Sequence, residues 1–147
     1  ELRHDEGKAA KALKILLAED NPVNALLIRE LLRRRGHAIR EVTTGTAAVA
    51  AMEEDRFDLL LTDIHMPGMD GIEATRRLRT EWPTPQSQVP VLGLTANVHN
   101  ADHDRCMAVG MSALVLKPFD RHALCGLIEE QLLRSAAFLQ RFHRTEG

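Results

Sequence analysis

Short apolar runs alternate along the chain with longer segments in which apolar residues recur at helical spacing. The apolar runs predict five strands, at residues 14–20, 38–42, 57–62, 89–95 and 112–117. The amphipathic segments predict five helices, at 22–37, 46–54, 71–81, 100–109 and from Asp120 to at least Leu133. Pro22 suits the first turn of its helix, and Gly36 suits the stop. Strict alternation of strand and helix is typical of a parallel sheet.

The central strands are apolar at successive positions, as in LLL at 59–61, VLGL at 91–94 and LVL at 114–116. A strand with no polar face must have both of its faces covered. The pattern therefore predicts an α/β fold, with a doubly wound parallel sheet of five strands and helices on both faces.

Length and composition narrow the class of protein. A chain of 147 residues suits one domain. The net charge of −2 favours neither nucleic acid nor an anionic membrane as a direct partner. No apolar run approaches the roughly 18 residues that span a bilayer. Cys106 and Cys125 do not suggest a secreted disulfide framework. We therefore expect a cytoplasmic domain with no direct membrane contact.

The two ends of the chain differ from its middle. Residues 1–13 are charged and mixed, and we expect a linker or N-terminal extension there. The domain itself is expected at 14–134. Residues 135–147 are expected to be a helical extension, in which Glu146 and Gly147 could be a remnant of cloning.

Polar side chains follow the predicted strands where these end. Glu19 and Asp20 end the first strand, Asp63 the third, Thr95 the fourth and Lys117 the fifth. Ligands of open α/β sheets bind beyond the carboxyl ends of the strands, where the strand order reverses. We therefore expect three carboxylates, a hydroxyl and an ammonium group at one rim of the sheet.

Three neighbouring carboxylates repel one another unless a cation lies among them. Oxygen ligands suit a hard cation, and Mg²⁺ is the expected one. A carboxylate can also attack phosphorus to form an aspartyl phosphate. The metal and Lys117 would then neutralise the phosphoryl oxygens, and the Thr95 hydroxyl would hydrogen-bond to one of them. The pattern thus places Asp63 where a phosphoryl group can reach it.

These residues resemble the receiver domains of two-component response regulators, from about Lys14 to Leu133. Four motifs carry the resemblance: Glu19-Asp20, DIHMPGMDG at 63–71, Thr95-Ala96 and Lys117-Pro118-Phe119. Each is weak alone, and the four in this order are specific. The resemblance implies a flavodoxin-like sheet of strand order 2-1-3-4-5.

The resemblance also implies roles for individual residues. Asp63 would accept a phosphoryl group from the phosphohistidine of a histidine kinase or a histidine phosphotransfer protein. Asp20 and Asp63 would contact Mg²⁺ directly, Glu19 would act through water, and the His65 backbone carbonyl would complete the protein ligands. The His65 and Asn97 side chains would flank an attacking water and tune the lifetime of the phosphoryl group. Such a domain is a signalling switch and not an enzyme in its own right.

The chain departs from the family at one position. Many receivers carry Tyr or Phe three residues before the lysine, where this chain has Leu114, and it contains no Tyr at all. In the family that aromatic residue moves inward as the threonine reaches the phosphoryl group. We expect Thr95 and Leu114 to form the switch, with a smaller difference between the two states.

Two local sequences resemble receivers of hybrid sensor kinases in particular, namely AEDNPVN at 18–24 and LTAN at 94–97. The whole protein would then be a histidine kinase. Whether the domain dimerises stays open.

Two other functions are alternatives to this one. A haloacid-dehalogenase-like phosphatase also uses an aspartyl phosphate, but it needs a second Asp two residues after the nucleophile, where this chain has His65. A receiver-like interaction module that is never phosphorylated would lack an acid or the lysine, and none is missing.

Each motif also has a purely structural alternative. Asp63 could cap a turn, and Glu19-Asp20 could cap the next helix, although Asn21 is also available for that role. Thr95 could be an ordinary strand residue, and Lys117 could be solvated. Pro118 argues against the last alternative, because a cis bond before it would turn the lysine toward the rim.

Two further sets of side chains contain residues that can bind metals or pack in a core. A transition metal could be bound at helical spacing by His99, His103 and Cys106, although a solvated helix face with a buried thiol is the simpler interpretation. Packing is the simpler role for Met66, Met69, Met107 and Met111.

Overall fold

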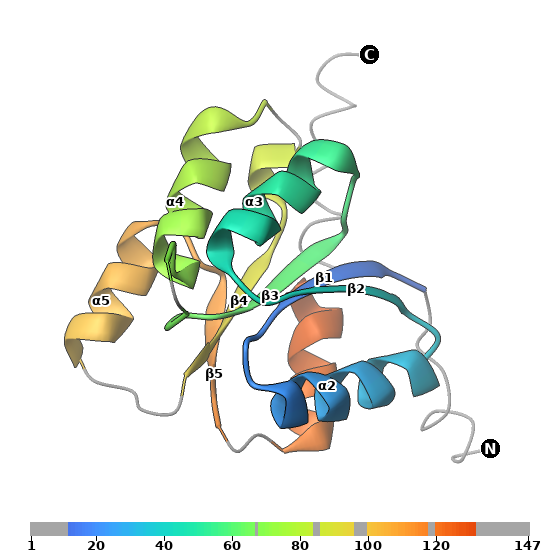
Figure 1. The fold of residues 1–147 in the computed structure, drawn as a ribbon. Coiled ribbons are helices and arrows are strands. Elements are labelled where there is room, and N and C mark those ends of the chain that lie inside the picture. Colours follow the sequence, from blue (N-terminus) through green and yellow to red (C-terminus); the bar gives the residue numbers. More distant parts are fainter. Residues whose placement is uncertain (1–11, 67, 84–85, 96–99, 118–119, 132–147) are drawn as a thin grey trace, which may run out of the picture.

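The computed structural model describes residues 12–66, 68–83, 86–95, 100–117 and 120–131 (Figure 1). The elements in chain order are β1 (Lys14–Ala18), α2 (Pro22–Arg34), β2 (Ala38–Val42), α3 (Gly45–Glu54), β3 (Leu59–Asp63), α4 (Gly71–Glu81), a 3₁₀ turn (Gln86–Gln88), β4 (Val91–Thr95), α5 (Asn100–Ala108) and β5 (Ala113–Leu116). Residues 121–131 form a further helix. The predicted alternation of strands and helices is confirmed within these residues.

The five strands form one parallel sheet in the order β2-β1-β3-β4-β5. This is the strand order that the sequence resemblance implied. The chain passes from β1 outward to β2 and then returns to the other side of β1, so the order reverses between β1 and β3. The carboxyl ends of these two strands are therefore where a ligand site is expected.

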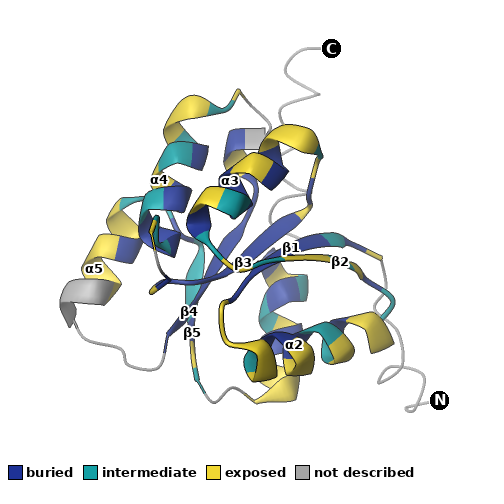
Figure 2. Cartoon of the chain, in the orientation of Figure 1, coloured by how far each residue is buried: buried dark blue, intermediate teal, exposed yellow. Residues whose placement is uncertain are grey.

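Helices cover both faces of the sheet (Figure 1). On one face, α3, α4 and α5 pack on alternate strand residues in a core that includes Leu16, Leu60, Ile64, Met52, Ile72, Leu78 and Cys106. On the other face, α2 and the helix at 121–131 pack on the intervening residues, in a core that includes Ile15, Leu17, Leu61, Leu94, Ile28, Leu32, Leu124 and Ile128. Figure 2 shows the buried central strands β1, β3 and β4 between helices whose outer sides are exposed. The fully apolar strands are thus explained by two cores.

The ends of α2 follow from local chemistry. The Asn21 side chain accepts hydrogen bonds from the backbone N–H groups of Val23 and Asn24, at 2.9 and 3.1 Å. Such a cap contributes about 1 kcal/mol to helix stability. Gly36 follows the helix with a φ of 96°, a value that most side chains disfavour. Asn21 supplies the cap, so Glu19 and Asp20 remain available for other contacts.

Several strand boundaries differ slightly from the prediction. β1 ends at Ala18, so Glu19 and Asp20 lie beyond the strand. β3 extends through Asp63, which is paired with Leu94 in the register of β4. The acid is thus the last residue of a fully buried strand.

The partly buried Arg79 connects three segments near α4. Its guanidinium group donates to the carbonyl oxygens of Gly110, Ser87 and Val89, at 2.6 to 3.0 Å. Burial lowers the pKa of Arg79 to about 10, so the group remains charged at neutral pH. Its charged hydrogen bonds hold the segments before β4 and β5 against α4.

The edge strand β2 is mostly exposed and carries paired charges. Arg29 of α2 donates to Glu41 at 2.7 Å, and Arg40 donates to Glu54 of α3 at 2.7 Å. These pairs connect the edge strand to a helix on each face of the sheet.

The structure also tests the predicted roles of the histidine–cysteine set and of the methionines. The His103 side chain is half exposed and Cys106 is fully buried, so these two do not share a surface, and His99 lies outside the described residues. Packing is confirmed for Met66 and Met111, which lie in a core. The packing prediction is wrong for Met107, which is 37% exposed.

Candidate functional site

Three acidic side chains meet at the carboxyl ends of β1 and β3. Glu19, Asp20 and Asp63 each present one carboxylate oxygen, and these oxygens all lie within 4.8 Å of one another. Within the part of the chain that the structure describes, this is the one cluster of its kind. The sequence prediction that these acids share one rim is confirmed.

The register of the sheet explains why the acids meet. Ala18 of β1 pairs with Thr62 of β3, so the residues that follow them, Glu19 and Asp63, lie at the same level. The Glu19 N–H donates to the Val42 carbonyl at 3.1 Å, which keeps this backbone extended past the end of β1. Adjacent parallel strands thus deliver two acids to the same place.

Lys117, which follows the edge strand β5, reaches these acids across the sheet. Its Nζ lies 2.9 Å from Glu19 Oε1 and 2.9 Å from Asp63 Oδ2. Its backbone N–H donates to the Thr95 carbonyl at 2.7 Å, which fixes the chain just after β5. Lys117 is therefore an ion-pair partner of the site and not a solvated lysine.

Burial controls the electrostatics of the cluster. Glu19 is 2% exposed, Asp63 is 8% exposed, and Asp20 is exposed. Burial raises the pKa of Glu19, and repulsion from Asp63 adds to this, while the hydrogen bonds from Lys117 and the Asn21 N–H oppose it. For Lys117, burial alone would lower the pKa, but its bonds to Glu19 and Asp63 outweigh this and raise it. A further positive charge near the acids would therefore be favourable.

The loop after β3 fixes the orientation of the Asp63 carboxylate. The His65 N–H donates to Asp63 Oδ1 at 3.0 Å, while Oδ2 faces Lys117. The Thr62 hydroxyl donates to the Asp63 backbone carbonyl at 3.0 Å. Both carboxylate oxygens are thus held by donors, and the His65 side chain is exposed beside them.

Two glycines let this loop approach its neighbours closely. A Cβ at Gly71 would lie 2.4 Å from the Asp63 carbonyl oxygen, and one at Gly45 would lie 2.0 Å from the Met69 carbonyl oxygen. The Gly45 N–H instead donates to that Met69 oxygen at 2.9 Å. Sequence reasoning missed the role of Gly45, because a glycine at the first position of a helix does not reveal which distant carbonyl it faces.

Thr95 and Leu114 lie on the strands beyond Asp63. Thr95 is buried at the end of β4, one residue after Leu94, the register partner of Asp63. Leu114 pairs with Gly93 and is partly buried against the core. A Cβ at Gly93 would lie 2.8 Å from the Leu114 side chain, so the glycine makes room for this leucine. Asn97, Pro118 and Phe119 lie outside the described residues.

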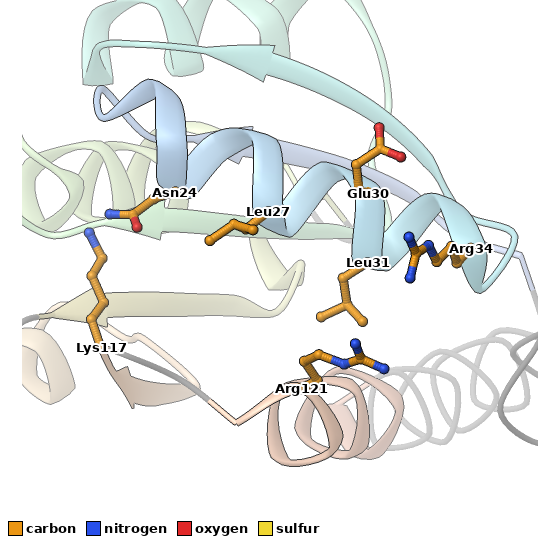
Figure 3. Close-up of a pocket in the computed structure, with 7 residues that line it drawn as sticks. All are labelled: Asn24, Leu27, Glu30, Leu31, Arg34, Lys117 and Arg121. Carbon is orange, nitrogen blue, oxygen red and sulfur yellow. The ribbon is translucent and has the colours of Figure 1, made fainter.

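Two grooves flank the start of α2 beside the acids. One, of about 340 Å³, runs between α2 and the helix at 121–131, with Leu27 and Leu31 along it and Lys117 and Asn24 at one end (Figure 3). The other, of about 440 Å³, lies between α2 and β2 and includes Asp20. The first turns of α2 thus stand exposed beside the site.

The donor set identifies the kind of metal that would fit. The three side chains offer only carboxylate oxygens, which are preferred by hard cations such as Mg²⁺. The three acids and Lys117 together carry two net negative charges when all four are ionised, which one divalent cation would balance. The residues therefore fit Mg²⁺.

Comparison with known proteins places this geometry in a family context. Residues 15–129 match the family described as "Response regulator receiver domain". The chain is 39% identical to the sensor protein EvgS of Escherichia coli K12 over 106 residues, which are 72% of this chain and 8% of that protein. It is 36% identical to the sensor protein GacS of Pseudomonas syringae over 121 residues, covering 82% of this chain and 13% of that protein.

The fold also matches solved structures. The receiver domain of sensor histidine kinase PA1611 from Pseudomonas aeruginosa superimposes with a TM-score of 0.75 at 36% identity, covering 83% of this chain and 98% of that one. That crystal structure has a magnesium ion coordinated in its active-site cleft. The chain therefore matches nearly all of a solved receiver domain but only a small part of EvgS and GacS.

The raised pKa of Glu19 predicts how stability depends on pH without metal. A carboxyl group whose pKa is raised by folding stabilises the fold fully below its unfolded pKa of 4.5, and this contribution is lost as pH rises through the folded pKa. In EDTA, we expect wild-type protein to lose stability relative to Glu19→Gln between pH 4.5 and 8. Urea denaturation across this range measures the difference.

Glu53→Gln, on an exposed part of α3, is the matched control and should follow wild type. If wild type instead gains stability relative to Glu19→Gln between pH 4.5 and 8 in EDTA, the ion pair with Lys117 outweighs the cost of burying the acid, and the prediction is wrong.

Proposed function

Since the chain belongs to the response regulator receiver domain family, we propose that it is a phosphoacceptor, which takes a phosphoryl group from a phosphohistidine onto Asp63 in a Mg²⁺-dependent reaction. The observation that supports this most directly is Lys117 Nζ, 2.9 Å from Asp63 Oδ2 within a cluster of three acids. An ammonium group and a metal site beside one carboxylate are what phosphoryl transfer to that carboxylate requires.

The proposed transfer forms a bond from an Asp63 oxygen to phosphorus and breaks the bond from phosphorus to the imidazole nitrogen of the donor. The bonding electrons leave with the imidazole. Lys117 would neutralise a phosphoryl oxygen, and the Thr95 hydroxyl would donate to another. Mg²⁺, when bound, would neutralise the remaining charge on the phosphoryl group.

The proposed metal ligands follow from the positions of the acids. We propose that Asp20 and Asp63 bind Mg²⁺ directly, that Glu19 acts through water, and that the His65 backbone carbonyl completes the set. Glu19 suits the indirect role, because its two oxygens already face Lys117 and the Asn21 N–H. The exposed Asp20 has an open side from which water can approach.

Conformational switching is proposed to involve Thr95 and Leu114. Leu114 packs beside Gly93 and against the core that includes Ile64, directly after Asp63. A leucine at this place has neither a ring nor a hydroxyl group, so its rearrangement would change the surface less than that of an aromatic residue.

The two alternative functions have weaker support. The phosphatase needs an acid at position 65, where this chain has an exposed histidine. An unphosphorylated module has no need of a paired lysine and three convergent acids, all of which are present.

We propose that the chain is part of a hybrid histidine kinase that works in the cytoplasm. The chain spans only 8% and 13% of two sensor proteins that it matches, so in such a hybrid kinase the kinase activity would rest on other segments. None of the described helices is both long and apolar enough to cross a membrane. The expected partners are a histidine kinase or a histidine phosphotransfer protein.

A protein donor must cover the surface around Asp63, because this residue is only 8% exposed. That surface includes the start of α2, where Val23, Leu26 and Leu27 are 64%, 45% and 57% exposed. Adjacent apolar side chains beside a reactive group favour a protein partner over a small donor alone. We propose that this part of α2 contacts the phosphodonor.

The phosphoacceptor role is tested by intact mass after incubation with Mg²⁺ and acetyl phosphate. Wild type should gain one phosphoryl group that hydroxylamine removes, and Asp63→Asn should gain none, because an amide is a poor nucleophile. Omitting Mg²⁺ should abolish the gain. An adduct at full yield on Asp63→Asn would disprove the assignment.

The lifetime of the phosphoryl group tests the role of the His65 side chain. The exposed side chain of His65 lies beside the Asp63 carboxylate, and we propose that it orients a water and is not an obligatory base. His65→Ala should therefore be phosphorylated as wild type is and should differ by only a few-fold in its decay rate after the donor is removed. Unchanged decay would place the side chain away from the water, and loss of phosphorylation would contradict its proposed role. Asn97 is proposed to act in the same way.

The α2 surface is tested with two donors. Leu27→Asp should lower the transfer rate from a phosphorylated histidine phosphotransfer domain at least about tenfold, because a charge would be buried in the interface. Its labelling by acetyl phosphate should not change. Met107→Asp, on α5 and also exposed, is the control and should behave as wild type. Equal rates for Leu27→Asp and wild type with the protein donor would exclude this surface.

A further inference from the structure

Two side chains hold the start of β1, at the end of the strands opposite the acids. The Leu13 N–H donates to His37 Nδ1 at 3.0 Å, and the Lys14 N–H donates to Asp58 Oδ2 at 2.8 Å. The backbone carbonyls of the same two residues accept from Ala38 and Asp58. Four hydrogen bonds thus fasten the chain where it joins the sheet, and one of them depends on a histidine.

The hydrogen bond from Leu13 determines which nitrogen of the His37 ring carries the proton. Nδ1 accepts a hydrogen bond, so it carries no proton, and the proton of the neutral ring must be on Nε2. His37 is only 4% exposed, and its Nε2 has no hydrogen-bond partner within the described part of the chain. The ring is thus buried with one nitrogen satisfied by Leu13 and the other unsatisfied.

Charged groups surround His37 from three segments. Arg35 lies at the end of α2, Glu129 lies on the helix at 121–131, and Asp58 precedes β3. Arg35 Nε donates to Glu129 at 3.0 Å, and Asp58 is occupied by the Lys14 N–H. The two acids near His37 thus already have partners, so neither stands ready to pair with a charged imidazole.

We propose that His37 is a proton-operated latch on the start of β1, and that a proton taken from solvent onto Nδ1 releases the Leu13 N–H and loosens the start of this strand. A protonated Nδ1 is a donor and would face the Leu13 N–H, which is also a donor. The two groups cannot remain in contact. This inference concerns the amino ends of the strands, whereas Asp63 lies at their carboxyl ends, and it does not depend on the phosphoacceptor role.

The direction of the pH dependence follows from burial. Burial lowers the pKa of His37 below its ordinary 6.5; Glu129 opposes this and Arg35 adds to it. The unfolded chain then binds a proton more readily than the folded one. The latch contributes its full stability above pH 6.5 and loses it as pH falls from 6.5 through the folded pKa.

Nuclear magnetic resonance of the 147-residue chain tests the latch between pH 7.5 and 5. We expect ¹⁵N shifts of His37 to show the Nε2–H tautomer at neutral pH. As pH falls from 6.5 toward the folded pKa of His37, the protection of the Leu13 amide against hydrogen exchange should fall by up to about tenfold per pH unit, as expected for an opening that takes up one proton. The amide protection of Leu61, in the central strand β3, should change less.

Two variants distinguish the effect of protonating His37 from the effect of losing its hydrogen bond with Leu13. His37→Asn places an amide oxygen near the position of Nδ1 and cannot titrate, so its Leu13 protection should stay constant with pH. His37→Leu has no acceptor, so its Leu13 amide should exchange rapidly at every pH. His103→Asn, at a half-exposed histidine on α5, is the control and should keep the wild-type pH dependence.

Three results would overturn the proposal, namely an Nδ1–H tautomer at neutral pH, a His37 pKa at or above 6.5, or Leu13 protection that does not change in wild type. The wild-type measurement decides the question by itself if His37→Asn fails to fold.

Discussion

The contact of one lysine with two buried acids is the interaction on which this site depends. Lys117 follows the edge strand β5, yet its ammonium group reaches Asp63 on β3 and Glu19 after β1. Without Lys117, the fully buried side chain of Glu19 would place an unpaired carboxylate beside that of Asp63. Burying such a charge without a partner would destabilise the fold. The lysine makes the acidic cluster tolerable in the folded protein, and it still leaves a net negative charge that attracts a cation.

The loop between β3 and α4 shows how backbone fit supports this charge arrangement. Asp63 is oriented by the His65 N–H, and the carbonyls at each end of the loop lie against Gly71 and Gly45. Larger residues at either glycine would move the loop and therefore the carboxylate. The position of the reactive group is thus set by packing on α3 and α4 as much as by its own strand.

Much of this arrangement could be predicted from the sequence, because it follows from local patterns. The polar residues at the ends of apolar runs identified Glu19, Asp63 and Lys117, and the parallel sheet placed them at one rim. The strand order itself came from family resemblance, since alternating strands and helices fit several orders. Contacts such as Gly45 with Met69 and His37 with Leu13 were not predictable, because they depend on which distant backbone groups meet after folding.

The paired charges on β2 have a consequence for the domain among other proteins. An exposed edge strand offers backbone groups to which another chain can add, and charged side chains oppose such addition. Arg40 and Glu41 both lie on this edge, and each is held by an ion pair with a neighbouring helix. A second strand approaching the edge would have to displace or bury these charges. The domain is thereby protected against edge-to-edge aggregation at high local concentration, as when it is tethered within a larger assembly.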